Sequence, residues 1–162
     1  MKASVECTFY TSETGQWVFE VGTLIRRCGV PQKWFKRFET PEKDESTRKI
    51  TEQQSWSDAR YAFIYKMFAE HSNSIADQLL SRAESNITET WETESPSTAA
   101  RIPLLLTMST DGSSTIETGS GYQSTTYGSK TPQLSAQLSV AMAADSIARM
   151  LDYYTQHPQE ES

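Results

Sequence analysis

The sequence predicts an α+β fold, and three observations support that prediction. Apolar and polar residues alternate in two short N-terminal segments, as in strands that bury one face. Apolar residues recur at helical spacing in three longer segments further along the chain. A short continuous apolar run, which suits a buried strand, lies between the second and third of these segments. Strand-forming and helix-forming segments thus occupy separate parts of the chain, which is typical of α+β proteins.

The N-terminal segments predict a β-hairpin. Residues 3–10 place Val5 and Phe9 on one side and polar residues on the other. Residues 17–21 alternate in the same way. Residues 11–15 between them are turn-forming, so we expect the two strands to pair with each other.

Residues 21–39 predict two short helices joined by a tight turn. Thr23 can cap the first helix, Gly29 can adopt the positive φ that ends it, and Pro31 fits the first turn of the second. With Leu24 placed before the Gly29 turn, this segment resembles the helix-turn-helix motif of DNA-binding regulators. The alternative is an ordinary surface helical hairpin whose basic residues are solvated.

The resemblance implies six nucleic-acid-binding residues. Three would reach base edges and phosphates in a major groove and three would hold the DNA backbone: Gln32, Lys33 and Lys36, and Arg26, Arg27 and Arg37. Residues 1–50 hold nine Lys and Arg against seven Asp and Glu, whereas residues 51–162 hold six against fourteen. Since a phosphate backbone attracts clustered positive charge, we expect any contact with duplex DNA in the N-terminal third.

The polar residues 41–56 predict a linker and a domain boundary, with a hairpin and helix-turn-helix segment at 1–40 and an α+β core at 57–155. A helix from Ser57 to about His71 is apolar nearly all round, so we expect it to be buried on most sides, with Phe63 almost fully buried. An amphipathic helix from residue 74 to near residue 91 completes a central helical hairpin.

The second half of the chain predicts short antiparallel strands and then the longest helix. Residues 102–108 suit a buried strand, and a turn at 110–113 leads into a second strand at 115–118. The stretch 107–131 is rich in Ser, Thr, Gly and Tyr, which suits exposed strands or a long flexible loop. The longest helix begins at residue 132 and ends near residue 154, and residues 156–162 are expected to be a disordered tail.

The C-terminal helix carries two apolar stripes. We expect one stripe to pack on the chain's own sheet and the other to pack on a second copy in a homodimer. Ala141 and Ala148 are the predicted interface residues, because small side chains allow two helices to approach closely. The alternative is a monomer in which both stripes lie in a wide groove of the same chain.

The sequence offers few groups for catalysis. His71 and His157 lack metal-ligand spacing, and Cys7 and Cys28 are expected to be reduced structural thiols. No nucleophile elbow or phosphate-binding loop occurs, so we expect no enzymatic activity, no cofactor and no metal site. No apolar run is long enough for a signal-peptide core or a membrane span, so we expect a cytoplasmic protein with no membrane contact.

These observations predict a small non-enzymatic interaction or assembly protein, for example a viral or accessory protein. It would act by binding an unidentified protein partner. The alternative is a DNA-binding regulator that uses a helix-turn-helix at residues 21–39.

Overall fold

The computed structural model describes residues 2–22, 26–27, 30–31, 35–40, 56–84, 96, 98–118, 122–126 and 131–157. For residues 26–27, 30–31, 35–36, 56–57 and 84 it describes the backbone only. In these ranges the chain forms a six-stranded antiparallel sheet and three helices, which confirms the predicted α+β class.

The strands of the main sheet follow the order β5-β2-β1-β6-β7-β8. Their bounds are Lys2–Thr11 for β1, Trp17–Gly22 for β2, Phe35–Glu39 for β5, Ala100–Met108 for β6, Ser114–Thr118 for β7 and Gln123–Thr126 for β8. Two further short strands pair with each other: β3 (Arg26–Arg27) and β4 (Val30–Pro31). The predicted N-terminal hairpin is confirmed, and its turn contains Gly15 at φ 83°.

Strand β1 joins the two halves of the sheet. It pairs with β2, where Phe9 lies opposite Phe19, and with β6, where Phe9 lies opposite Ala100. The strands before and after the expected linker at 41–56 therefore belong to one sheet. Most of that linker lies outside the described residues.

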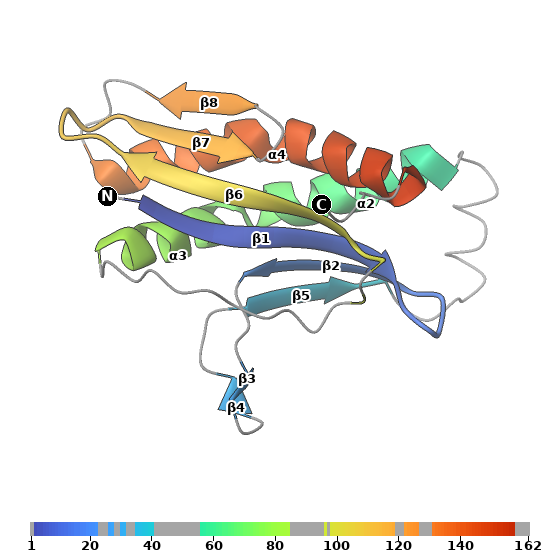
Figure 1. Ribbon diagram of the computed structural model, residues 1–162. Coiled ribbons are helices and arrows are strands. Elements are labelled where there is room, and N and C mark those ends of the chain that lie inside the picture. The colour runs from blue at the N-terminus through green and yellow to red at the C-terminus, as the bar shows by residue number, and fades with distance from the viewer. Residues whose placement is uncertain are drawn as a thin grey trace.

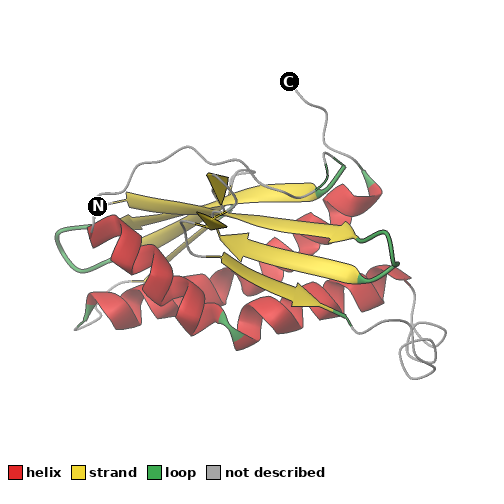
Figure 2. Cartoon of the chain, turned by 90° about the horizontal axis from the view of Figure 1, so that it is seen from below, coloured by secondary structure: helices red, strands yellow, loops and turns green. Residues whose placement is uncertain are grey.

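All three helices lie on the same face of the sheet, behind the strands in Figure 1. Helix α2 spans Trp56–Glu70, α3 spans Ser72–Glu84 and α4 spans Pro132–Gln156. The side chain of Thr131 accepts a hydrogen bond from the Leu134 N–H, and Pro132 occupies the first turn, so α4 begins where the sequence predicts. Figure 2 shows the strand layer and the helix layer from below.

The core lies between the two layers. Alternate residues of β1 and β6 point toward the helices, and the largest fully buried side chains are Phe9, Phe19, Phe68, Ile64, Ile75, Leu79, Ile102, Leu104, Leu106, Ile116, Ile147 and Leu151. Cys7 is a free thiol in this core, and its burial raises the pKa of the thiol. Cys28 lies outside the described residues.

Residues Phe35–Glu39 correct one expectation, because they form strand β5 and not part of a helix. The ring of Phe38 stacks on Phe19, with centroids 6.0 Å apart, and on His71, with centroids 4.5 Å apart. Pairing with β2 and these contacts outweigh the local helix signal. Arg26–Arg27 and Val30–Pro31 likewise pair as strands, where the sequence predicts the end of one helix and the start of the next. Residues 23–25, 28–29 and 32–34 of the expected helix-turn-helix lie outside the described residues.

Helix α2 is less buried than its composition suggests. Ala59, Ile64 and Phe68 face the core, but Tyr65 is 41% exposed and Phe63 is only half-buried. The expectation that Phe63 is almost fully buried is therefore wrong. The helix layer is one helix thick, so one side of α2 necessarily faces outward.

The second apolar stripe of α4 divides between the core and the surface. Ala148 is fully buried in the core of a single chain, so its side chain offers no surface to a second copy. Ala141 is exposed, as are Leu134 and Leu138. The interface prediction is thus wrong for Ala148, because α2 packs against this side of α4.

Candidate functional site

The large apolar side chains that are exposed gather on the helix layer. Among the described residues, those that are most exposed are Tyr65, Leu134, Leu138, Met142 and Tyr153. One of them belongs to α2 and the others to α4. The opposite face of the sheet is mostly polar and charged, so the apolar surface of the described chain lies on the helix side.

Four of the side chains on α2 and α4 form a cluster that we call the tyrosine patch: Tyr61, Tyr65, Arg149 and Tyr153. Tyr61 and Tyr65 are one turn apart on α2, and their rings stack with centroids 5.9 Å apart. The Arg149 guanidinium lies over the Tyr61 ring, 5.4 Å from its centroid. Tyr153 follows Arg149 by one turn of α4 and is 56% exposed.

Hydrogen bonds hold the patch in place. The Tyr61 hydroxyl donates to Asp145, and Arg149 Nε donates to Asp145 Oδ2 at 2.9 Å. The hydrogen bond from Tyr61 is the main cause that lowers the pKa of Asp145, and the same bond raises the pKa of Tyr61. At neutral pH Asp145 is therefore charged, and Tyr61 keeps its proton.

A second ion pair fixes α2 against α4 beside the patch. Arg60 Nε donates to Asp152 Oδ1 at 3.0 Å, and both side chains are only 14% exposed. Next to this pair lies a hollow of about 480 Å³, lined by Asp58, Tyr61, Arg149, Asp152, Tyr153 and Gln156. Two aromatic rings and several charged groups therefore border one depression on the surface.

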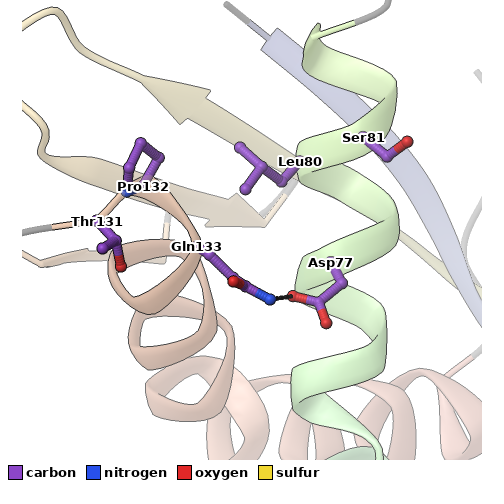
Figure 3. A pocket seen from close by; sticks show the side chains of 6 residues that line it. All are labelled: Asp77, Leu80, Ser81, Thr131, Pro132 and Gln133. Atoms are coloured by element: carbon purple, nitrogen blue, oxygen red, sulfur yellow. Dashed lines mark hydrogen bonds between the residues drawn. The ribbon is translucent and has the colours of Figure 1, made fainter.

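Another hollow, of about 500 Å³, lies between α3 and the start of α4 (Figure 3) and is lined by Asp77, Leu80, Ser81, Thr131, Pro132 and Gln133. Asp77 Oδ1 accepts hydrogen bonds from Gln133 Nε2 at 3.2 Å and from Gln137 Nε2 at 3.0 Å. These bonds join the two helices across the hollow, so Asp77 has a structural role there.

The sheet face opposite the helices carries its own polar cluster. Glu20 is 7% exposed and accepts a hydrogen bond from the Tyr10 hydroxyl at 2.5 Å. Burial, followed by this hydrogen bond, raises the pKa of Tyr10 to about 12. Arg37 pairs with Glu39 at 2.5 Å and lies 3.9 Å from Glu20. The cluster thus sets one guanidinium and one tyrosine hydroxyl against two carboxylates.

The six residues implied by the helix-turn-helix resemblance are only partly described. Arg37 lies on the sheet face opposite the helices, beside two carboxylates. Arg26 and Arg27 lie on β3 and Lys36 on β5, with the backbone alone described, and Gln32 and Lys33 lie outside the described residues. DNA contact by these residues stays a prediction.

The tyrosine patch was not expected from the sequence. Tyr61 and Tyr65 lie in the helix that the sequence predicts to be buried on most sides. Two features of the sequence indicate a surface position for the tyrosines. They are four residues apart, which places them on one side of a helix, and the neighbouring Lys66 favours an exposed position. A tyrosine hydroxyl also favours a surface where one end of the side chain is hydrated.

No protein-family model, curated protein or solved structure matches this chain. Within the described ranges, no helix is long and apolar enough to cross a membrane. Nor does the described part of the chain hold three His, Cys, Asp or Glu side chains grouped as a metal site. Function is therefore inferred from the surface chemistry of the chain.

Proposed function

We propose that this chain acts by binding a protein partner through the tyrosine patch. The observation that carries the proposal is the grouping of tyrosine rings and an arginine around a hollow between α2 and α4. Tyrosine and arginine are enriched among the residues that contribute most to protein–protein affinity. Tyrosine supplies a large contact area and loses little conformational freedom when it is ordered.

The patch is also organised before a partner arrives. Tyr61 is held by Tyr65, Arg149 and Asp145, and the Arg60–Asp152 pair fixes the spacing of the two helices. Side chains that are already ordered lose less entropy on binding, so more of the contact energy appears as affinity.

A binding role fits the chemistry of the patch better than a reaction. The charged groups at its centre are paired with each other, and the pKa of Tyr61 is raised away from neutrality. A general acid or base needs a pKa near the working pH. The paired groups instead supply charged hydrogen-bonding positions around an apolar centre, as in a protein interface.

The test compares a patch variant with a matched control by affinity capture. In the patch variant Tyr65 and Tyr153 are both changed to Ser. In the control, Thr107 and Thr115, which lie side by side on the sheet face opposite the helices, are changed to Ser. Proteins retained by the wild type and by the control, but lost by the patch variant, are identified and then titrated with purified protein.

We expect the patch variant to weaken binding of such a partner by at least about tenfold, which corresponds to about 1.4 kcal/mol. Circular dichroism and urea unfolding should show that both variants fold as the wild type does, since the changed side chains are exposed or half-buried. If the patch variant retains the same proteins with the same affinities as the control, the proposal is wrong.

A further inference from the structure

Strand β8 is the end strand of the sheet, and in the described part of the chain it pairs only with β7 (Figure 1). The Thr118 N–H donates to the Tyr122 carbonyl at 3.0 Å where this pair of strands meets. Along two antiparallel strands, residue pairs that are hydrogen-bonded to each other alternate with pairs that are not. The N–H and C=O groups of Gln123 and Thr125 therefore point away from β7, toward the end of the sheet.

The two ends of the sheet differ in charge. Strand β8 has the sequence Gln-Ser-Thr-Thr and no charged side chain. Strand β5, at the other end, carries Lys36, Arg37 and Glu39 among its five residues. Charged side chains on an end strand oppose the addition of another strand. The β8 end is thus the one that can accept a strand without placing charges in the contact.

A row of exposed apolar side chains on α4 runs beside β8. Leu134, Leu138 and Met142 follow one another at intervals of four residues and are 48%, 45% and 55% exposed. Met142 lies next to the strand, because its carbonyl accepts a hydrogen bond from the Tyr122 hydroxyl at 3.0 Å. The Ser124 hydroxyl likewise donates to the Ser139 carbonyl at 2.8 Å. We call β8 together with this row the β8 end surface.

We propose that the β8 end surface binds a second copy of this chain and forms a two-fold dimer. Two β8 strands that pair antiparallel are related by a two-fold axis perpendicular to the sheet. That axis keeps the helix layers of both copies on the same face of a continuous sheet. The Leu134, Leu138 and Met142 row of one α4 then faces the same row of the other.

A second copy fits this surface better than an added peptide strand. A peptide strand pairs with the backbone of β8 but leaves the apolar row on α4 uncovered. A second copy covers both the β8 backbone and the apolar row, because its own α4 lies behind the sheet beside its own β8. Neither β8 nor the row carries a charged side chain, so the described contact sets no like charges of the two copies against each other.

The contact consists of one four-residue strand and three apolar side chains from each copy, so we expect a dissociation constant in the micromolar range, about 1–100 μM. The dimer leaves the tyrosine patch uninvolved, since none of its residues belongs to the β8 end surface. The Tyr65 and Tyr153 patch variant should therefore dimerise as the wild type does, and failure of one proposal does not imply failure of the other.

The test is sedimentation equilibrium of the full chain from about 5 to 500 μM, with one variant for each half of the surface and a control for each. Thr125→Pro removes an N–H that points away from β7, and Leu138→Lys places a charge in the apolar row. Arg37→Pro is the control at the opposite end, because the same alternation places its N–H away from β2. Ala62→Lys is the control on an exposed position of α2.

We expect the wild type and both controls to dimerise with equal affinity, and Thr125→Pro and Leu138→Lys to weaken the dimer at least about tenfold while remaining folded. A wild type that stays monomeric at about 500 μM would overturn the proposal, and the β8 end surface would then be assigned to a different protein partner. Dissociation by Arg37→Pro would assign the contact to β5 instead. A Leu138→Lys variant that dimerises normally would also overturn it, because the row on α4 would then play no part.

Discussion

Phe63 and Phe68 lie on the same helix but differ in burial, and this difference predicts unequal losses of stability on replacement by alanine. Phe68 is fully buried, and its ring meets Phe19 edge-on with centroids 6.4 Å apart. Phe63 is half-buried and packs at a tilt on Phe9 and Trp17, with centroids 6.3 Å and 6.0 Å apart. Both changes remove the same atoms from one helix, so propensity and unfolded-state effects nearly cancel.

The expected magnitudes follow from the two environments. Removing a fully buried Phe ring leaves a cavity that the surrounding core fills only in part, so Phe68→Ala should lower the free energy of unfolding by ~3–5 kcal/mol. Phe63 is only partly buried, so its ring contributes less transfer free energy than a fully buried ring, and it makes two aromatic contacts. Phe63→Ala should therefore cost ~2 kcal/mol. The total stability of a domain is typically ~5–15 kcal/mol, so the first change brings the chain close to unfolding.

Urea unfolding followed by circular dichroism measures both losses, provided that the slope of free energy against urea is unchanged. The neighbouring Ala62 serves as a control on the exposed side of the same helix, where Ala62→Ser should change stability by less than ~0.5 kcal/mol. Equal losses for Phe63→Ala and Phe68→Ala, or a larger loss for Phe63→Ala, would refute the assignment of the inner and outer sides of α2.

Two further predictions concern hydroxyl groups that donate hydrogen bonds within the fold. The Ser139 hydroxyl lies 2.7 Å from Thr126 Oγ1 and 2.9 Å from Ser114 Oγ, so Ser139→Ala should lower the free energy of unfolding in urea by ~1–2 kcal/mol. The same change at half-buried Ser146 on this helix should be near neutral. Equal effects of the two changes would contradict the hydroxyl cluster. The pKa of Tyr10 is raised from 10.0 to about 12, so its stabilising effect is complete below pH 10 and is lost as the pH rises toward 12. Stability should therefore decline less steeply over that range in Tyr10→Phe than in the wild type, and parallel curves would argue against the Tyr10–Glu20 bond.

The sequence predicted the elements whose apolar residues follow a regular period. Strands β1, β2, β6 and β7 and the three helices were expected close to where they lie, because each buries one side against the core. Strand β5 was missed, since it depends on Phe38 meeting Phe19 and His71 from other parts of the chain. Strand β8 has no apolar period, and its place is set by pairing with β7 and by the Ser124–Ser139 hydrogen bond.

The candidate site was harder to predict than the fold. Tyr61 and Asp145 are separated by 84 residues, and Arg60 and Asp152 by 92, so no local pattern links them. Their meeting depends on α2 packing against α4, which the periodicity of either helix alone does not specify. Burial on α2 was overestimated for the same reason, because the number of layers over each side of a helix is a property of the whole fold.

The position of β1 at the centre of the sheet has a consequence for synthesis. Its partner β6 comes far later in the chain, as the Glu6–Arg101 ion pair across these strands shows with its separation of 95 residues. At a synthesis rate of about 5–20 residues per second, β1 waits roughly 5–20 s after its own synthesis before β6 has been made. During that time the β1–β2 hairpin carries an uncovered apolar face and an unpaired edge. Pairing between partners so distant in sequence also closes slowly, so the nascent chain is most prone to aggregate in this interval.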